Sequence, residues 1–288
     1  MDIRLQDLSV GYGRTVVSEG LNASLSEGQL VCLLGTNGTG KSTLLRTIAG
    51  FQKALGGQVL VNEKPIQQID VEHLPHLMSV VLTESVDVQG LSVRELVGMG
   101  RTPYTSFFGR LKAEDKRVVD EAMSMVGLRH LAERQVHSLS DGERQKAVIA
   151  KALAQQTPFI LLDEPTAFLD YPSRIETMRL LSRLAHDMHK AVLLSTHDVE
   201  LALQLSDILW LMADKGICVG KPRDLAADGS VARFFACQGV EFSPDTLTFH
   251  IRPEKDDSKM RNVQPELVYW PSWVERFCMA FLTSALNS

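Results

Sequence analysis

The sequence has little cysteine and no long apolar run. Its 288 residues contain four cysteines, and no two of them form a C-x-x-C pair. Secreted disulfide frameworks are much richer in cysteine and metal sites need closer spacing, so we expect reduced thiols in a cytosolic protein. No run approaches the roughly 20 apolar residues that cross a bilayer. The chain is therefore expected to be soluble, or to sit at a membrane by holding another protein.

The sequence also lacks an excess of basic charge, internal repeats and low-complexity segments. Its 30 basic and 35 acidic residues give a formal net charge of −5. That balance does not favour a nucleic-acid backbone as the main partner. The start of the chain has no basic segment followed by an apolar one, so we expect no secretion signal. An apolar content of 44% allows a full-sized core.

Apolar patterns predict a parallel α/β sheet. Alternation within residues 1–30 predicts short strands of a half-buried sheet. The apolar run 30–34 then predicts a strand covered on both faces, followed by a glycine-rich turn and a helical pattern over 42–49. Two further apolar strands, 159–162 and 191–194, also end in polar residues. Because ligands bind beyond the carboxyl ends of parallel strands, these three ends predict one site.

The rest of the chain divides by pattern. Helical periodicity predicts a helical subdomain inserted into the sheet domain, at about 84–157. The character changes again near residue 221, where an alternating strand pattern is followed by a capping box, Ser272 with Glu275, that begins a last helix. We expect a main domain over 1–220 and a small α+β extension over 221–288.

Residues 35–42 match the phosphate-loop pattern G-x-x-x-x-G-K-[ST]. Glycines let successive backbone N–H groups face inward, and the helix N-terminus adds partial positive charge. Lys41 is expected to reach the β- and γ-phosphates and Ser42 to ligate Mg²⁺. Kinases, motors and GTPases share such a loop, so it does not by itself name a function. The expected nucleotide-binding residues here are Gly35, Thr36, Asn37, Gly38, Thr39, Gly40, Lys41, Ser42 and Thr43.

Two adjacent carboxylates end the second apolar strand. Asp163 suits a contact with Mg²⁺, direct or through water, and Glu164 suits the polarisation of an attacking water. Phosphoryl transfer is catalysed mostly by positioning and charge stabilisation, so a metal, a base and a lysine supply most of what it needs. The alternative is a pair of acids that cap a helix before Pro165.

Ser140, Asp141, Gly142 and Glu143 follow Leu139 and precede a helical pattern. Together with the phosphate loop, this stretch resembles the signature of ABC ATPases, usually written L-S-G-G-Q. The resemblance implies a P-loop NTPase (RecA-like) core with an antiparallel β subdomain, and two chains that sandwich two ATP molecules. Ser140 would then contact the γ-phosphate of an ATP held by the opposite chain. Taken alone, S-x-x-E is an ordinary capping box.

Other residues extend the resemblance over about 1–220. Tyr12 stands where the family stacks an aromatic ring on adenine. Asp170 resembles the D-loop aspartate, which couples the two sites. His197, after the third apolar strand, resembles the switch histidine that holds the γ-phosphate and orients Glu164.

Three positions depart from the family pattern. Thr83 occupies the place of a glutamine that touches Mg²⁺ and transmits the nucleotide state. Asp141 replaces a glycine and Glu143 a glutamine. A carboxylate near a triphosphate is repulsive unless it points away or pairs with a cation. We therefore expect weaker ATP-driven closure and altered coupling.

The segment 100–111 resembles the helical insert of the ATPases that serve iron-complex importers, which move ferric siderophores, haem or cobalamin. The resemblance implies a homodimer with ATP and Mg²⁺, peripheral at the cytoplasmic face of the inner membrane. Its partners would be two integral membrane permease subunits and, indirectly, a substrate-binding protein. The Arg, Pro and aromatic residues of this segment suggest a surface for docking a partner.

Two other classes remain. Soluble ABC ATPases that act on ribosomes usually carry two ATPase units, and those that act on DNA carry long coiled coils. This sequence has one phosphate loop and no sustained heptads. Exporter ATPases, the second class, are often fused to membrane spans, and this sequence has no apolar run of that length.

Overall fold

The computed structural model of the chain divides into two units, Met1–Val219 and Gly220–Ser288. Within them the structure describes residues 1–82, 90–105, 110–213, 216–236 and 240–251. Thr83 and the expected last helix lie outside the described residues.

An antiparallel sheet in the first unit has the strand order β2-β1-β4-β5. Its strands are β1 (Asp2–Tyr12), β2 (Thr15–Ser26), β4 (Gly56–Val61) and β5 (Lys64–Pro65). The expectation of short strands at the N-terminus is wrong, because β1 and β2 have 11 and 12 residues. Register shifts along their pairing absorb local interruptions and keep one continuous ladder.

A second sheet has the order β10-β9-β3-β8-β7-β6. Its strands are β3 (Leu30–Gly35), β6 (Met78–Val81), β7 (Phe159–Asp163), β8 (Ala191–Ser195), β9 (Ile208–Ala213) and β10 (Gly216–Gly220). The pairs β3–β8, β3–β9, β6–β7 and β7–β8 are parallel. β3, β7 and β8 are buried along their whole length, as their apolar runs predict.

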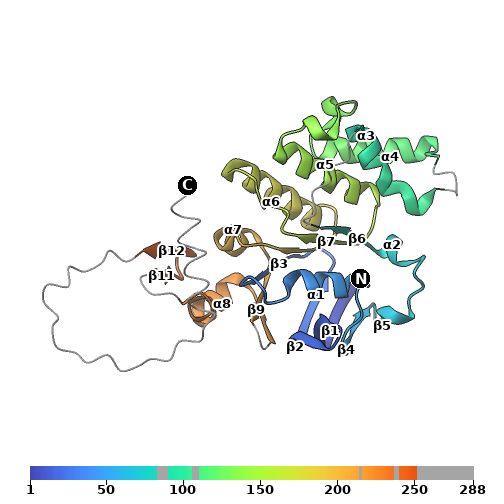
Figure 1. Ribbon diagram of the computed structural model, residues 1–288. Coiled ribbons are helices and arrows are strands. Elements are labelled where there is room, and N and C mark those ends of the chain that lie inside the picture. The colour runs from blue at the N-terminus through green and yellow to red at the C-terminus, as the bar shows by residue number, and fades with distance from the viewer. Residues whose placement is uncertain (83–89, 106–109, 214–215, 237–239, 252–288) are drawn as a thin grey trace, which may run out of the picture. The chain divides into compact units, whose positions relative to one another are not determined.

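In the first unit, α1 and α6 lie against strands of the parallel sheet, and three other helices pack on one another. The α-helices are α1 (Lys41–Ile48), α2 (Leu74–Leu77), α3 (Val93–Gly98), α4 (Ala113–Met125), α5 (Asp141–Ala154), α6 (Tyr171–His186), α7 (Val199–Leu205), α8 (Pro222–Ala227) and α9 (Ser230–Phe234). The 3₁₀ helices are η1 (Ile66–Gln68), η2 (Met99–Tyr104), η3 (Arg129–Leu131) and η4 (Val136–Ser138). α3, α4 and α5 pack on one another and stand away from the antiparallel sheet (Figure 1). α6 lies against β3 and β8.

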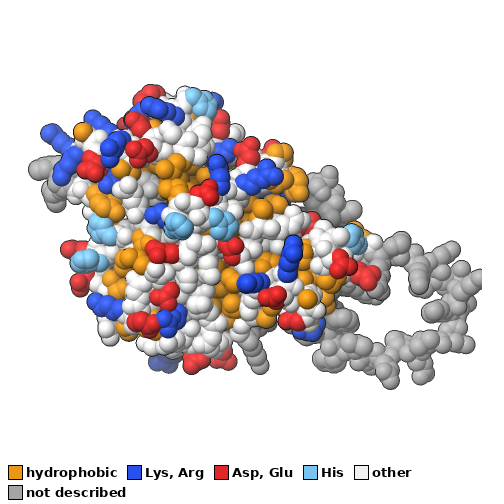
Figure 2. All heavy atoms as spheres, turned by 180° about the vertical axis from the view of Figure 1, so that it is seen from behind, with side chains coloured by type: hydrophobic (Ala, Val, Ile, Leu, Met, Phe, Trp, Pro, Cys, Tyr) orange, Lys and Arg blue, Asp and Glu red, His pale blue; other side chains and the backbone are white. Residues whose placement is uncertain are grey.

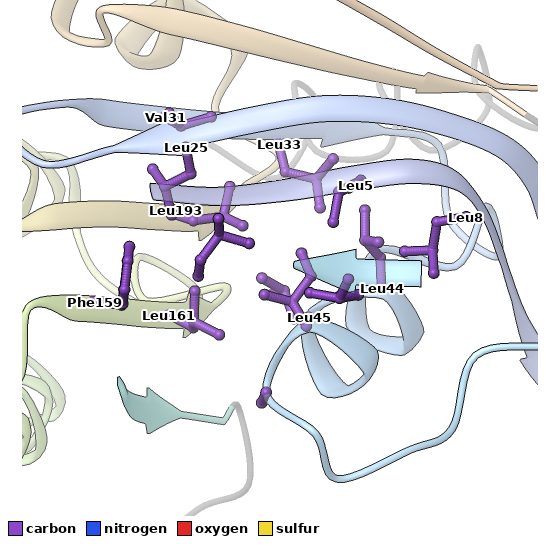
Figure 3. Packing of buried hydrophobic residues seen from close by; sticks show 14 of the residues in the cluster. Leu5, Leu8, Leu25, Val31, Leu33, Leu44, Leu45, Phe159, Leu161 and Leu193 are labelled. Atoms are coloured by element: carbon purple, nitrogen blue, oxygen red, sulfur yellow. The ribbon is translucent and has the colours of Figure 1, made fainter. Parts of the chain in front are cut away.

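The main hydrophobic core lies between the two sheets. Leu44 and Leu45 of α1 face side chains from β1 and from the parallel strands β3, β7 and β8 (Figure 3). Each is essentially buried, and burying a leucine contributes about 1.5–3 kcal/mol. The core therefore fixes α1 at the end of β3, where the phosphate loop connects the two.

The second unit contains α8, α9 and a two-stranded antiparallel sheet, β11 (Val240–Ser243) and β12 (Thr248–Ile251). The Phe249 ring lies 5.6 Å from the ring of Phe235 and 4.9 Å from that of Phe242. These aromatic contacts hold the sheet against the end of α9.

The surface carries charges of both signs. On the face shown in Figure 2, acidic and basic side chains are interspersed and no extended basic area forms. Among the described residues, no helix is both long and apolar enough to cross a membrane.

Candidate functional site

The phosphate loop connects β3 to α1, and its backbone leaves no room for larger residues at two glycines. A Cβ atom on Gly35 would lie 2.8 Å from the Met212 carbonyl oxygen and from the Thr39 hydroxyl. Gly40 has a φ of 98°, and a Cβ atom there would lie 2.8 Å from Val17. The tight curl needed to bring backbone N–H groups around a phosphate therefore depends on both glycines.

Lys41 is the first residue of α1, and its side chain is buried. Its ammonium group donates hydrogen bonds to the Gly35 oxygen (2.8 Å) and the Thr36 oxygen (3.3 Å). Burial lowers the pKa of Lys41, while the negative charges of Glu164 and Asp163 oppose that effect. The lysine and the two predicted carboxylates thus act on one another electrostatically.

Asp163 and Glu164 lie where β7 ends. The buried Asp163 carboxylate accepts a hydrogen bond from the Ser195 hydroxyl at 2.7 Å. Glu164 has a φ of 49°, a left-handed conformation that is uncommon outside glycine. Its carboxylate lies 2.7 Å from Nε2 of His197. The two acids are therefore oriented by side chains of the neighbouring strand's end and do not cap a helix.

The hydrogen bond from His197 lowers the pKa of Glu164, and burial opposes it to a smaller degree. The charges of His197 and Lys41 act in the same direction as the hydrogen bond. Glu164 is consequently an ionised acceptor at neutral pH, a state in which it can accept a proton or orient water.

Sheet register explains this convergence. β7 and β8 are parallel, and Asp163 is paired with Ser195 in their register. His197 follows Ser195 by two residues, just beyond the same end of the sheet. Sequence analysis predicted Glu164 and His197 as a pair, and it placed Ser195 among the polar residues that end this strand without giving it a role.

Asp163 and Ser42 carry oxygen atoms of the type that Mg²⁺ prefers. Asp163 supplies a carboxylate and Ser42 an exposed hydroxyl in the first turn of α1. Mg²⁺ prefers oxygen ligands, takes one or two carboxylates and keeps several waters. Within the described ranges no group of three or more His, Cys, Asp or Glu residues is arranged to hold a metal. A carboxylate and a hydroxyl are oxygen ligands of the kind that Mg²⁺ takes beside phosphate oxygens, so the chemistry of Asp163 and Ser42 fits this ion.

Tyr12 ends β1 and is 55% exposed. Its hydroxyl accepts a hydrogen bond of 3.1 Å from the hydroxyl of Thr43 in the first turn of α1. It also lines an open surface pocket of about 540 Å³ with Arg46 and Phe51. The ring is tied to the phosphate-loop helix and keeps a face for stacking.

The predicted signature residues begin α5. Ser140 accepts a hydrogen bond from the Glu143 amide (3.3 Å) and donates one to the Glu143 carboxylate (2.9 Å). The same carboxylate accepts from the Ser140 amide at 2.9 Å, which completes a capping box. These hydrogen bonds lower the pKa of Glu143. Asp141 forms an ion pair of 3.0 Å with Arg144, so its charge has a partner within the same turn.

The start of α5 also touches the predicted D-loop region. A Cβ atom on Gly142 would lie 3.1 Å from the Ser173 hydroxyl of α6. The carboxylate of Asp170 accepts a hydrogen bond of 3.1 Å from the Ser173 amide and so caps α6. Within one chain, Gly142 and Asp170 are therefore linked through Ser173, which sequence reasoning did not foresee.

The segment 100–111, which was expected to dock a partner, contains a buried residue. Arg101 is 5% exposed and pairs with the buried Asp115 at 3.0 Å, so it is not available to a partner. Tyr104 lies under its guanidinium at 3.9 Å and donates to the Gln155 oxygen at 2.9 Å. Sequence reasoning assigned Arg101 to a docking surface because the segment is rich in Arg, Pro and aromatic residues, and the burial of Arg101 corrects that assignment. Met99 in the same turn is exposed, and residues 106–109 lie outside the described residues.

A phosphate loop between a strand and a helix, with two carboxylates and a histidine at neighbouring strand ends, defines a P-loop nucleoside-triphosphate hydrolase. A model of the family described as ABC transporter matches residues 18–167. The petrobactin import ATP-binding protein FpuD of Bacillus anthracis is 35% identical over 241 residues, 83% of this chain and 88% of FpuD.

Two solved structures share the fold. A metal-chelate type ABC transporter in an inward-facing conformation has a TM-score of 0.74 at 26% identity, over 88% of this chain and 98% of the other. A dimeric ATP-binding cassette in a post-hydrolysis state, bound to ADP and Pi, has a TM-score of 0.65 at 26% identity, over 76% and 98%. The chain belongs to the ABC transporter family as an ATP-binding subunit, and it binds and hydrolyses ATP. The family and the α/β P-loop fold expected from the sequence are confirmed.

Proposed function

We propose that this subunit drives the import of an iron complex, a ferric siderophore or haem, across the membrane. The relative named for petrobactin import and the structural neighbour described as a metal-chelate transporter support this cargo class. The protein would work as a homodimer, which the dimeric post-hydrolysis cassette supports. Two integral membrane permease subunits would hold it at the cytoplasmic face of the inner membrane, and a substrate-binding protein would deliver the cargo.

The phosphate loop and its surroundings would bind the nucleotide. Tyr12 would stack on adenine, and Lys41 would leave its loop oxygens for the β- and γ-phosphates. The loop residues 35–43 would donate backbone and hydroxyl hydrogen bonds to the phosphates. Ser42 and Asp163 would hold Mg²⁺. When bound, Mg²⁺ supplies positive charge to the phosphate oxygens.

Glu164 and His197 would carry the hydrolytic step. The ionised Glu164 carboxylate would orient the attacking water and accept its proton, while Lys41 would balance charge on the phosphates. His197, which holds that carboxylate at 2.7 Å, would turn toward the γ-phosphate when ATP is present. The single observation that carries this assignment is that His197, Glu164 and Lys41 come together at the carboxyl end of the parallel sheet.

Ser140 and Gly142 would complete the site of the opposite chain. For its hydroxyl to donate to a γ-phosphate, Ser140 must give up the Glu143 carboxylate. The charge of Asp141 is paired with Arg144, so Glu143 is the residue whose negative charge at this helix N-terminus would slow closure on ATP. Asp170, through Ser173 and Gly142, would link the two sites.

The proposal is tested by measuring the ATPase rate per chain against protein concentration. A rate that rises with concentration supports a site shared between two chains. We expect Glu164→Gln to lower the rate by at least about a hundredfold while ATP binding persists. The matched control is Glu121→Gln, an exposed acid of α4 paired only with Arg117 among the described contacts, which should retain the wild-type rate. A rate per chain independent of concentration would remove the role of Ser140 in the opposite site.

The cargo is tested in vesicles that contain the complete transporter. ATP-dependent uptake of a ferric siderophore or haem, delivered by the binding protein, is expected, with cobalamin as the comparison substrate. Uptake of cobalamin alone would overturn the cargo and leave the ATPase assignments intact.

A further inference from the structure

Ser195 is a fully buried serine at the carboxyl end of β8. Its hydroxyl donates a hydrogen bond to the Asp163 carboxylate at 2.7 Å. The same oxygen accepts a hydrogen bond from the backbone amide of Glu164 at 2.9 Å. One hydroxyl group therefore joins the side chain of the first acid to the backbone of the second.

We propose that Ser195 is a positioning residue for ATP hydrolysis, holding Asp163 toward the metal position and Glu164 toward the attacking water. This inference rests on the roles proposed above for Asp163 and Glu164. Ser195 itself touches neither nucleotide nor water in this scheme, and it acts through the two acids.

The backbone at Glu164 explains why such a support is needed. A φ of 49° places this non-glycine residue in a conformation that persists only when its surroundings hold it. Ser195 holds the backbone amide, and His197 holds the carboxylate two residues further along. Backbone and side chain of Glu164 are thus fixed by the end of one neighbouring strand.

The chemistry of a hydroxyl suits this bridge. A serine has one O–H donor and two acceptor lone pairs, so it can donate to a carboxylate and accept from an amide at once. Alanine can do neither, cysteine is a weak donor of similar shape, and threonine keeps the hydroxyl. Removing the bridge takes one hydrogen bond from the Asp163 carboxylate and takes from the Glu164 amide its acceptor at this oxygen.

Another buried serine of the same sheet separates positioning from simple space filling. Ser79 on β6 is 1% exposed, and its hydroxyl has no hydrogen-bond partner in the described part of the chain. Ser79→Ala removes the same atom from a comparable environment. It therefore reports what the loss of a buried hydroxyl does when nothing depends on it.

The experiment uses the full chain and compares Ser195→Ala, Ser195→Cys, Ser195→Thr and Ser79→Ala with the wild type. We expect Ser195→Ala to lower kcat between about tenfold and about a hundredfold with KM for ATP changed less than about threefold. Ser195→Thr should remain within about threefold of the wild type, and Ser79→Ala within about twofold. The kcat of Ser195→Cys should lie between those of the alanine and threonine variants. If the alanine variant does not fold, the kcat of the cysteine variant provides the test.

A second measurement is independent of turnover. Without nucleotide, hydrogen exchange of the Glu164 amide, followed by NMR, should be at least about tenfold faster in Ser195→Ala than in Ser79→Ala. Two results would overturn the inference: a folded alanine or cysteine variant with wild-type kcat, or a threonine variant as slow as alanine. Glu164→Gln is measured beside them, because its retained activity would show that the proposed function fails, whereas its loss beside an active Ser195→Ala shows that only this inference fails.

Discussion

Replacing Arg101 with methionine removes a buried cation from between η2 and the helices α4 and α5. The guanidinium donates to Asp115 (3.0 Å), to the Ala154 oxygen (2.9 Å) and to the Gln156 side chain (2.8 Å). Methionine fills a similar volume without any donor. The variant leaves the Asp115 carboxylate buried with only the Lys112 amide, at 2.9 Å, among the donors named here.

The magnitude follows from the burial of both partners, each side chain being 6% exposed. Removing one partner of a buried pair typically costs about 3–5 kcal/mol, because the other charge remains without compensation. At about 2–4 °C per kcal/mol for a chain of this size class, the melting temperature should fall by roughly 6–20 °C. Replacing both residues, in Arg101→Met with Asp115→Leu, should recover most of that loss.

The dependence on pH has a definite sign. Hydrogen bonds from the Lys112 amide and then from Arg101 lower the pKa of Asp115. The pair's contribution to stability is therefore fully present above the unfolded pKa of roughly 3.9 and is lost as the pH falls through the lower folded value. The difference between wild type and Arg101→Met should shrink over that acidic range.

Denaturant unfolding followed by circular dichroism measures this difference. Arg94→Met is the matched control, because Arg94 pairs with Asp120 and Glu133 but is 39% exposed, and its loss should cost about 0–1 kcal/mol. An Arg101→Met variant no less stable than the Arg94→Met variant at neutral pH would refute the reasoning.

Two further outcomes concern single side chains. Glu143→Gln removes a charge from the N-terminus of α5 and should destabilise the subunit by about 0.3–1 kcal/mol in denaturant unfolding. The same variant should show stronger ATP-dependent dimerisation in sedimentation. Unchanged dimerisation would show that the charge does not oppose closure. Burial raises the pKa of the Cys32 thiol to about 12, so iodoacetamide at pH 8 should modify the exposed Cys218 and leave Cys32 unmodified in the native protein, as read by mass spectrometry. Rapid native labelling of Cys32 would contradict its burial in β3.

The sequence predicts those parts of the site that depend on local pattern. The phosphate loop needs glycines and a lysine at fixed spacing, and an apolar run such as β7 can only be a buried strand or helix segment. β6 was missed because its four residues carry too little pattern to separate a strand from a helix segment. β9 was also missed, although its sequence ILWLMA is an apolar run like that of β7. Asp163, Glu164 and His197 were found because they belong to the polar segments that follow two apolar runs and match family motifs.

Contacts between distant segments could not be predicted. Ser195 directly follows the apolar run 191–194, but its partners are set by the register of β7 and β8, which the sequence does not display. Arg101 resembles a surface residue in sequence and becomes buried because α4 and the end of α5 close around it. Such outcomes are set by tertiary packing, which a single sequence does not display.

The helix α5 joins the signature residues to the segment where β6 begins. Its 14 residues span about 21 Å, with Ser140 at the start. Just past its other end, the Gln155 side chain donates to the Pro75 oxygen (2.6 Å) and the Met78 oxygen (3.0 Å), where β6 begins. One helix therefore connects Ser140 to the first residue of β6.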